Sequence, residues 1–428
     1  MKIFCSGIGG IGLSAYAALQ QHAGHDVFGS DRSDSTLLDD LRQQGIQISL
    51  NQDGSAIPTG CDLFVHSEAI PTDAPERKLA KERGIRSITY FEGLGELSQG
   101  YRVIAVCGTH GKSSTTAMAA RVLVDAGLDP TIVVGTKVPD LGGKNWRKGE
   151  SNLFLLEACE YRRDFRFIDP SIVLMLNVDG DHFDAFSSVA DYQHAFVEFL
   201  RRLPEDGLVI THGGDADCLR VAREADRPMD DADELPVPAL AVPGEHMRQN
   251  ARLVMALARE LDIPDDAALA SLQAFRGTWR RMEIKGEGPK ESLIVDDYAH
   301  HPKEIRASLS GLREAYPSKR MICVFQPHTH ERTRTFYKEF LEAFGDADIV
   351  VIPDIFNARS DIETEMVDVT TFIADLAAAS GKRVENGQGM EATEKLLRDS
   401  LIEPGDLVVC MGAGTITKLA DNLVRTNP

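Results

Sequence analysis

The residues with the clearest chemical potential are Lys112 and Ser113, which end the run Cys-Gly-Thr-His-Gly-Lys-Ser. A lysine ammonium at this place can contact nucleotide phosphates, and the following hydroxyl can bind Mg²⁺. Glycines let backbone N–H groups converge on phosphate oxygens, and a helix that begins here adds partial positive charge. The stricter pattern has a further glycine where this chain has Val106. We predict an ATP-binding phosphate loop made of Gly108, Thr109, His110, Gly111, Lys112, Ser113 and Ser114.

A second glycine-rich segment opens the chain. Residues 7–12 have the form G-x-G-x-x-G, between an apolar run that favours a strand and a helical pattern. Asp31 ends the next apolar run, about twenty residues past the glycines, where an acid can contact a ribose. Read alone, this pattern indicates NAD, but a nucleotide sugar has the same diphosphate and ribose. The predicted binding residues are Gly7, Gly9, Gly10, Gly12, Ser30 and Asp31.

Two further positions could bind metal ions. Glu157 ends the apolar run 153–156, and in phosphate-loop proteins an acid at a neighbouring strand end binds Mg²⁺. His182 stands among carboxylates just beyond another apolar run and could bind a second metal. A single histidine in a loop is more often a hydrogen-bonding residue, so the residues alone leave its role open.

Cationic and histidine side chains gather in the last third of the chain. Arg280 and Arg281 precede a predicted strand, and neighbouring strand residues point to opposite faces, so at most one can aim at a given phosphate. Histidines and arginines also follow the apolar runs 292–297 and 321–325. Ligands bind at the carboxyl ends of parallel strands, so we expect an anion site for a carboxylate substrate there.

Composition limits the classes of function. The chain has 428 residues, 43% hydrophobic and 26% charged, which is typical of a globular protein. Its net charge of −20 argues against general binding to nucleic acid or anionic membranes. No apolar run could span a bilayer, and the N-terminus does not resemble a signal peptide. The cysteines show no metal-ligand spacing, and Cys5, Cys107, Cys323 and Cys410 lie in apolar runs, so we expect buried thiols in a cytoplasmic protein.

Strand and helix patterns alternate along the chain and restart twice, near Tyr101 and near Ser292. Such alternation predicts an α/β protein with parallel sheets. We predict three domains in series: a Rossmann-like domain at 1–98, a phosphate-loop ATPase-like domain at 99–288 and a second Rossmann-like domain at 289–428.

Taken together, these segments resemble the Mur ligases of peptidoglycan synthesis over essentially the whole chain. That family has a compact Gly-Thr-x-Gly-Lys-Ser/Thr loop, which accounts for Val106. His110 is similar to the muramate-binding, alanine-adding branch, and Phe196 stands where many later-acting ligases have a carbamylated lysine. Met247 departs from the family, which has an asparagine there that contacts adenine or ribose. The other segments that carry the resemblance are 7–12, 157–163, 296–302, 325–328 and 411–414.

The resemblance implies an ATP- and Mg²⁺-dependent ligase that joins L-alanine to the carboxylate of UDP-N-acetylmuramate through an acyl phosphate and releases ADP. The first domain would bind the UDP-sugar, and the third the amino acid and part of ATP, in a monomer or dimer. The roles implied are catalysis for Lys112, His182, Arg280 and Arg281, metal binding for Ser113, Glu157 and His182, ATP binding for Asn250 and Asp297, and amino-acid binding for Tyr298, His300, His328 and Arg332.

Two alternatives stay open at this point. A related ligase recycles a whole tripeptide onto UDP-N-acetylmuramate, and the segment 280–283 is similar to it as well. A nucleotide-binding sensor without catalysis is a different class, but it does not need Lys112, Glu157 and His182 together. An NAD dehydrogenase would not need the second, ATP-type loop.

Overall fold

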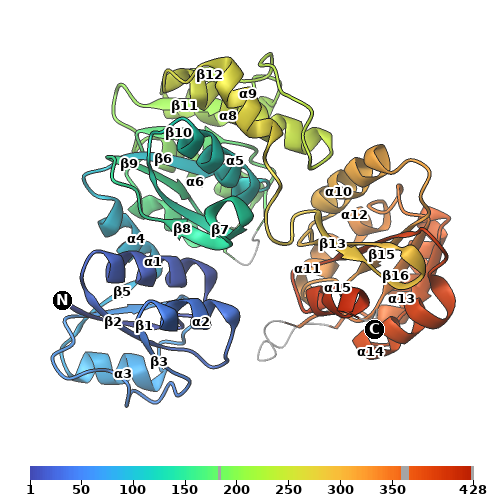
Figure 1. The fold of residues 1–428 in the computed structure, drawn as a ribbon, viewed down its shortest axis with the longest axis horizontal. Helices are drawn as coiled ribbons and strands as arrows, with labels where there is room; N and C mark the ends of the chain where they lie inside the picture. Colours follow the sequence, from blue (N-terminus) through green and yellow to red (C-terminus); the bar gives the residue numbers. More distant parts are fainter. Residues whose placement is uncertain (182–184, 358–365, 426–428) are drawn as a thin grey trace. The chain divides into compact units, whose positions relative to one another are not determined.

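The computed structural model describes residues 1–181, 185–357 and 366–425, whose strands form three separate sheets (Figure 1). The chain divides into two compact units. One contains residues 1–240 and 249–276, and the other contains 241–248 and 277–428. The first two sheets therefore belong to one unit and the third sheet to the other. Across the described ranges we find no helix with the length and apolar character that a membrane span requires.

The first sheet is wholly parallel. Its strands, in spatial order, are β3 (Gln47–Ser49), β2 (Asp26–Ser30), β1 (Lys2–Ser6), β4 (Leu63–His66) and β5 (Arg86–Thr89). Its helices are α1 (Ile11–His22), α2 (Thr36–Gln43), α3 (Pro75–Glu82) and α4 (Tyr90–Ser98). A capping box between Thr89 and Glu92 fixes the start of α4, because each side chain accepts a hydrogen bond from the other residue's backbone N–H.

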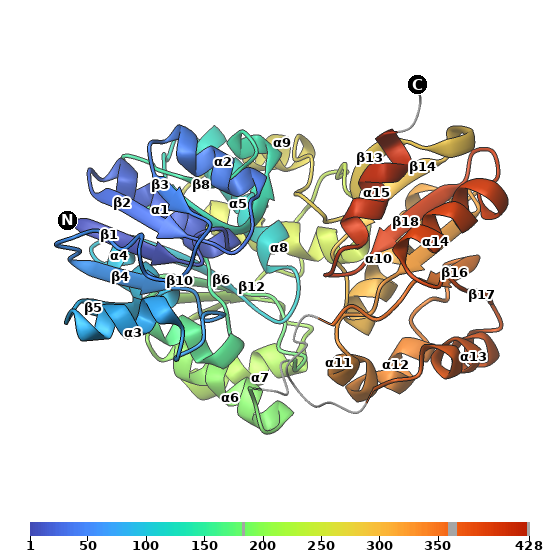
Figure 2. The ribbon, with the colours of Figure 1, turned by 90° about the horizontal axis from the view of Figure 1, so that it is seen from below.

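Alternation along β1 explains why helices cover both faces of this sheet. Ile3 and Cys5 are buried in the apolar cluster that includes the core-facing side of α1. Phe4 points the other way and packs with Phe64 and with Ala80 of α3. Figures 1 and 2 show α1 and α3 on opposite sides of the strands. Because helices cover both faces, the edge of the sheet at the carboxyl ends of its strands stays uncovered by them. The glycine loop at 7–12 lies at this edge.

The second sheet is parallel except for β8, which pairs antiparallel with β7. Its strands, in spatial order, are β12 (Met229–Asp231), β11 (Leu208–Thr211), β10 (Ile172–Met175), β6 (Arg102–Cys107), β9 (Leu153–Glu157), β7 (Thr131–Val138) and β8 (Lys144–Arg147). Its helices are α5 (Lys112–Asp125), α6 (Val189–Leu200), α7 (Ala216–Ala225), α8 (Glu245–Glu260) and α9 (Asp265–Gln273), with short 3₁₀ helices η1 (Pro139–Leu141) and η2 (Tyr161–Phe167).

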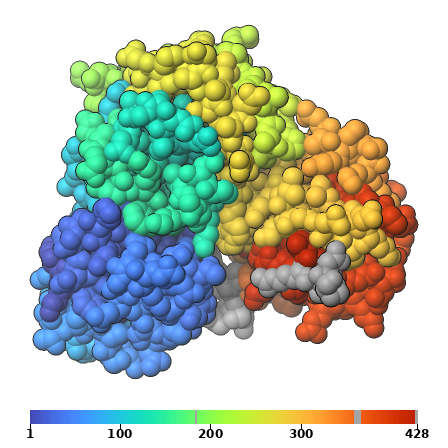
Figure 3. Space-filling view, in the orientation of Figure 1, coloured from blue at the N-terminus to red at the C-terminus, as the bar shows by residue number. Residues whose placement is uncertain are grey.

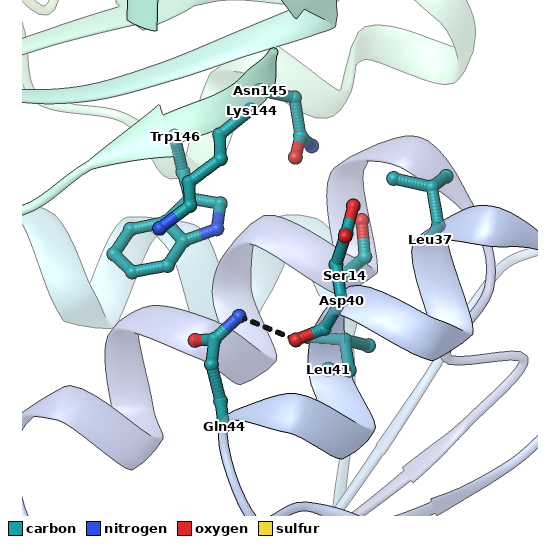
Figure 4. Close-up of a pocket in the computed structure, with 8 residues that line it drawn as sticks. All are labelled: Ser14, Leu37, Asp40, Leu41, Gln44, Lys144, Asn145 and Trp146. Atoms are coloured by element: carbon teal, nitrogen blue, oxygen red, sulfur yellow. Dashed lines mark hydrogen bonds between the residues drawn. The ribbon is translucent and has the colours of Figure 1, made fainter. Parts of the chain in front are cut away.

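The first two sheet domains contact one another directly, and their surfaces meet in the space-filling view (Figure 3). Asn145 of β8 donates a hydrogen bond to the carbonyl of Ile11, at the start of α1. Lys137 donates to Thr36 over 3.0 Å. A small cavity remains at this boundary (Figure 4), lined by Ser14, Leu37, Asp40, Leu41, Gln44, Lys144, Asn145 and Trp146. Side chains of the second domain therefore support the helix that follows the first glycine loop.

The third sheet is parallel except for β13, which pairs antiparallel with β14. Its strands, in spatial order, are β13 (Glu283–Glu287), β14 (Leu293–Asp297), β18 (Leu407–Met411), β15 (Met321–Phe325), β16 (Ile349–Ile352) and β17 (Arg383–Asn386). Its helices are α10 (Pro302–Ala315), α11 (His330–Thr335), α12 (Tyr337–Leu341), α13 (Val369–Ser380), α14 (Met390–Leu396) and α15 (Ile416–Arg425), with the 3₁₀ turn η3 (Pro289–Glu291) and the π-helical segment η4 (Leu397–Leu401). The domain boundaries predicted from the sequence place 283–287 in the central domain, whereas its backbone pairing joins it to the third sheet.

All seven cysteines are free thiols. Cys5, Cys107, Cys323 and Cys410 are buried, as their apolar surroundings in the sequence indicated. Burial raises the pKa of the Cys107 thiol, and the nearby Glu160 carboxylate raises it further. These thiols therefore stay protonated and serve as small apolar core residues.

Candidate active site

The phosphate loop joins the central strand β6 to helix α5. Gly111 has φ +84° and Gly108 has φ +141°, which L side chains rarely adopt. A Cβ on Gly111 would lie 2.7 Å from Leu176 Cδ2 and 2.9 Å from Asn250 Oδ1. Both glycines are therefore required by the backbone and its neighbours, and Asn250 lies directly beside the loop. Helix α5 starts at Lys112, directly after Gly111.

Lys112 lies in the first turn of α5 and bends back over the loop. Its ammonium donates to the carbonyls of Gly108, over 2.5 Å, and Thr109, over 3.1 Å. It also lies 3.0 Å from Glu160 Oε1 and 2.9 Å from Glu160 Oε2. Burial alone would lower the pKa of Lys112, but the surrounding acids, led by Glu160, outweigh burial and hold the pKa above its usual value. The ammonium is therefore a fixed positive charge at the rim of the loop.

Ser113 and Glu157 meet on the other side of the loop. The Ser113 hydroxyl donates to Glu157 Oε2 over 2.9 Å. The same oxygen accepts the Gly135 N–H over 2.8 Å, and a Cβ on Gly135 would lie only 2.6 Å from it. Because β6 and β9 are neighbouring parallel strands, their carboxyl ends place the predicted hydroxyl and carboxylate ligands together. His182, the third predicted metal ligand, lies outside the described residues.

The segment after β10 supports the loop from behind. Asn177 accepts from the His110 N–H over 2.8 Å and donates to the His110 carbonyl over 3.2 Å. The Thr109 hydroxyl lies 2.9 Å from the Tyr192 hydroxyl and accepts from the Asp179 N–H over 3.0 Å. These contacts fix the loop backbone. Within residues 1–181, 185–357 and 366–425, no three His, Cys, Asp or Glu side chains gather as a metal site.

The first glycine loop is held by the ends of β1 and β2. The Ser30 carbonyl accepts the N–H groups of Gly7 and Ile8, over 2.8 and 3.0 Å. Asp31 Oδ2 accepts the Gly9 N–H over 2.9 Å. All the predicted UDP-sugar residues therefore lie together, and Asp31 already contacts the glycine backbone. Gly10 is the N-cap of α1, and a Cβ on Gly12 would lie 2.7 Å from the Tyr90 ring.

In the other unit, Asp297 ends β14 and is buried. It accepts hydrogen bonds from the Ala299 N–H over 2.6 Å and from the Met282 N–H and the Ser308 hydroxyl over 3.0 Å each. Burial raises the pKa of its carboxyl to about 6, against these hydrogen bonds. Asp297 therefore organises the turn around the end of β14.

The two predicted catalytic arginines have different surroundings. Arg280 is 5% exposed, and its guanidinium donates to Asp296 over 3.4 Å and to the carbonyl of Gly412 over 2.5 Å. Arg281 is half-buried, lies over the Tyr298 ring at 5.0 Å and is 4.0 Å from a Glu304 oxygen. Arg280 is committed to contacts within the third sheet domain, whereas Arg281 is the more accessible cation.

The predicted amino-acid site gathers at the ends of β14 and β15. The rings of His300 and His328 lie 5.9 Å apart, and His328 stacks on Phe356 at 5.7 Å. His300 Nδ1 is 3.1 Å from the Tyr298 carbonyl and 3.3 Å from Glu304. Arg332 follows in α11. The two strand-end clusters therefore form one edge, with the histidines within reach of each other.

Three family models match successive parts of the chain. They describe the Mur ligase family catalytic domain at residues 2–102, the Mur ligase middle domain at 106–228, and the Mur ligase glutamate ligase domain at 280–414. The chain belongs to the Mur ligase family. The family predicted from the sequence is thereby confirmed, and the chain is a ligase.

Individual relatives match this Mur ligase over nearly its whole length. A UDP-N-acetylmuramate–L-alanine ligase of Lachnospira eligens is 37% identical, covering 98% of this chain and 97% of the relative. One from Clostridium novyi is 35% identical over 98% and 96%. The crystal structure of a UDP-N-acetylmuramate–alanine ligase from Thermotoga maritima has a TM-score of 0.82 at 27% identity, over 99% and 98% of the two chains. This likeness confirms the predicted α/β fold class.

A murein peptide ligase from Psychrobacter arcticus has a TM-score of 0.74 at 22% identity, over 99% of this chain and 98% of that one. That likeness shows the shared fold alone.

The structure also reveals residues in this Mur ligase to which the sequence assigned no role. Glu160 pairs with Lys112, and Asn177 holds the phosphate loop. Glu76 is fully buried and accepts the Ser6 hydroxyl over 2.5 Å at the end of β1. Glu160 stands three residues after Glu157, inside a segment that carried the family resemblance, so its position was a usable signal. Glu76 lies far from the glycines in sequence, and no local pattern marked it.

Proposed function

We propose that this Mur ligase uses ATP to join L-alanine to the carboxylate of UDP-N-acetylmuramate. The observation that carries the proposal is the group of Lys112, Ser113 and Glu157 around one glycine loop. Near full-length similarity to relatives named for this reaction supports the choice of substrates. The muramate carboxylate attacks the γ-phosphorus of ATP, which forms an acyl phosphate and releases ADP. The alanine amine then attacks the acyl carbon, a proton leaves the nitrogen, and phosphate departs.

Ser113 and Glu157 fit a Mg²⁺ ion by the chemistry of their donors. Both present oxygen atoms, which are the ligands Mg²⁺ prefers, and these oxygens lie 2.9 Å apart beside the loop. A bound Mg²⁺ would neutralise phosphate charge when the two anionic substrates approach each other. Lys112 would contact the γ-phosphate, and the N–H groups of the first turn of α5 would bind phosphate oxygens. Asn250 would contribute from beside Gly111.

The first glycine loop is our candidate for the UDP diphosphate. Its backbone N–H groups can bind phosphate oxygens without a cation. Each Asp31 oxygen has a second lone pair that can accept a ribose hydroxyl while Oδ2 holds the Gly9 N–H. A separate ATP-type loop removes the need for a dinucleotide here, so we infer a UDP-sugar and not NAD.

Within the third sheet domain, we propose that the carboxylate of L-alanine is bound by the cluster at the ends of β14 and β15. Histidine and arginine side chains there can donate charge-assisted hydrogen bonds to a carboxylate. Arg281 is our candidate for contact with a reacting anion, whereas Arg280 would position the turn through Asp296. Met247 is buried, so it would contribute apolar contact where the family has an amide. We place the enzyme in the cytoplasm with its nucleotide substrates.

The deciding experiment is an ADP-release assay with ATP, Mg²⁺ and UDP-N-acetylmuramate across amino acids and the tripeptide. L-Alanine should give the highest kcat/KM. Glycine and serine should react about 10- to 200-fold more slowly, because small changes in a pocket are worth only about 1–3 kcal/mol. A higher kcat/KM for the tripeptide would identify a recycling ligase instead. No ADP release with any acceptor would identify a non-catalytic nucleotide-binding protein.

A further inference from the structure

Glu160 is a buried carboxylate in contact with the key ammonium of the phosphate loop. It stands between β9 and η2 and is 1% exposed. Its oxygens lie 3.0 and 2.9 Å from the Lys112 nitrogen. An ionised carboxylate removed from water is costly unless a cation or several hydrogen bonds compensate it. The ion pair between Glu160 and Lys112 therefore differs from a surface ion pair, because its carboxylate is buried and depends on the ammonium for compensation.

The contacts of Lys112 account for all three of its N–H donors. One faces the Glu160 carboxylate, one the Gly108 carbonyl and one the Thr109 carbonyl. An ammonium has only three donors, so a phosphate oxygen that enters must replace a carbonyl or share a donor. Glu160 is the charged partner and hence the strongest of the three. The contact with Glu160 therefore fixes where the Lys112 ammonium lies on the loop.

Glu160 also lies near two further ionisable groups of the site, Tyr192 and Cys107. The Tyr192 hydroxyl lies 2.9 Å from Thr109, at the wall of the same loop. Burial raises the pKa of Tyr192, and the negative charge of Glu160 raises it further. Glu160 acts in the same way on Cys107, which ends strand β6. Glu160 therefore lies at the wall of the phosphate loop, within contact distance of the Lys112 ammonium.

We propose that Glu160 is a positioning residue that holds the Lys112 ammonium for phosphoryl transfer, which rests on the proposed function. The carboxylate offsets part of the lysine charge before ATP binds, so ground-state binding of ATP is weaker than a free lysine would allow. It also keeps the ammonium in one place when charge develops on the transferred phosphoryl group. Interactions that are stronger in the transition state than in the ground state raise kcat.

The first test is the kinetics of Glu160→Gln with ATP as the varied substrate. We expect kcat to fall about 10- to 100-fold while KM for ATP stays the same or falls, because a free ammonium binds ATP but is poorly placed. Glu160→Asp retains the charge and should recover part of kcat. Asp164→Asn is the matched control: it removes another buried carboxyl, 2% exposed and in the following segment η2, and should leave both constants unchanged. Equal loss in the Gln and Asp variants, or a rise in KM in proportion to the loss of kcat, would overturn the proposal.

The second test measures ATP binding by calorimetry and does not depend on ligation. Glu160→Gln should tighten ATP binding about threefold to tenfold when Lys112 is present, and should have no effect in Lys112→Ala. The same change in both backgrounds would show that Glu160 acts without Lys112 and would overturn the proposal. A wild-type protein that binds ATP and shows this coupling but forms no amide would contradict the proposed function alone.

Discussion

Two glycine loops in the first unit share their backbone design and differ in their side chains. Each follows a buried parallel strand, turns at a glycine of positive φ, which is +79° at Gly7 and +84° at Gly111, and leads into a helix. The loop at 108–113 contains a lysine and a serine and is faced by two glutamates. The loop at 7–12 contains neither, and Asp31 contacts its backbone. The shared geometry can bind phosphate, whereas charged side chains are needed to transfer it.

The two loops also differ in the charged groups that their proposed tasks require. Phosphoryl transfer brings an anionic nucleophile to an anionic phosphate, so the loop at 108–113 needs a fixed cation and metal-binding oxygens. A diphosphate that is only held needs hydrogen-bond donors, and backbone N–H groups provide them. Variants of each loop should therefore separate the two substrates, with transfer lost at one loop and UDP-sugar affinity lost at the other.

The largest effect is expected from Lys112→Ala. Ligation should fall by at least about 10³-fold, because the loop loses its fixed cation beside the transferred group. Binding of ATP should weaken by about 1.5–3 kcal/mol, the range for one charge-assisted hydrogen bond. ADP release and calorimetry measure the two effects. Lys78→Ala, an exposed lysine of α3, is the control and should behave as wild type. Turnover at the wild-type rate in Lys112→Ala would remove the distinction between the loops.

Gly111→Ala should come next, compared with Gly142→Ala. Both glycines have positive φ, of +84° and +70°, so both substitutions cost about 1 kcal/mol in backbone strain. A Cβ at 111 would also meet Leu176 and Asn250, whereas nothing lies within 4 Å at 142. We expect loss of ATP binding and a clearly lower Tm only for Gly111→Ala. Equal Tm values and equal ATP affinities in the two variants would contradict the packing of the loop.

Asp31→Ala tests the first loop. The Gly9 N–H loses its acceptor, so KM for UDP-N-acetylmuramate should rise about tenfold, in line with the loss of one hydrogen bond to a charged group, while KM for ATP stays unchanged. Asp26→Ala, on the exposed start of β2, is the control. Calorimetry with the wild-type protein should show tighter binding of UDP-N-acetylmuramate than of NAD. A parallel loss of ATP affinity in Asp31→Ala would mean that the two loops do not work separately.

The smallest effect on ligation is expected from a carboxyl pair between the two loop domains, which should act on stability instead. Burial, followed by the neighbouring Glu68, raises the pKa of Asp164 from 3.8 to about 8. Between these values the folded protein retains a proton that the unfolded chain has lost, so stability should decline as pH rises from about 4 to 8. The slope is at most about 1.4 kcal/mol per pH unit.

Urea unfolding at several pH values checks this linkage. In Asp164→Asn the amide resembles the neutral acid and does not titrate. The free energy of unfolding should therefore fall less steeply between about pH 5 and 8, the range below the raised pKa of Asp164. An unchanged slope in the variant would show that Asp164 does not hold this proton.

Much of the design could be predicted without the structure, since it is encoded locally. The run from Val103 to Ser114 places an apolar strand, glycines and a helix start in order, and such short-range patterns determine a loop whatever surrounds it. The position of Glu157 beside the loop could be predicted, because acids at neighbouring strand ends of a parallel sheet lie there, and β9 does pair with β6. The glycine loop at 7–12 could also be predicted, because it too has a local pattern of apolar strand, glycines and helix start.

Tertiary structure alone decided which partners these residues have. The sequence predicts Arg280 as a catalytic cation. In the structure, the turn before β13 directs its guanidinium to Asp296 and to the Gly412 carbonyl inside the third sheet domain. Strand β13 itself joined the third sheet through antiparallel pairing, which no local pattern specifies. The contact between Lys112 and Glu160 depends on strand order, because only the adjacency of β6 and β9 brings two distant segments to the same edge. Local sequence thus determined which groups could do chemistry, and the packing of strands determined which of them meet.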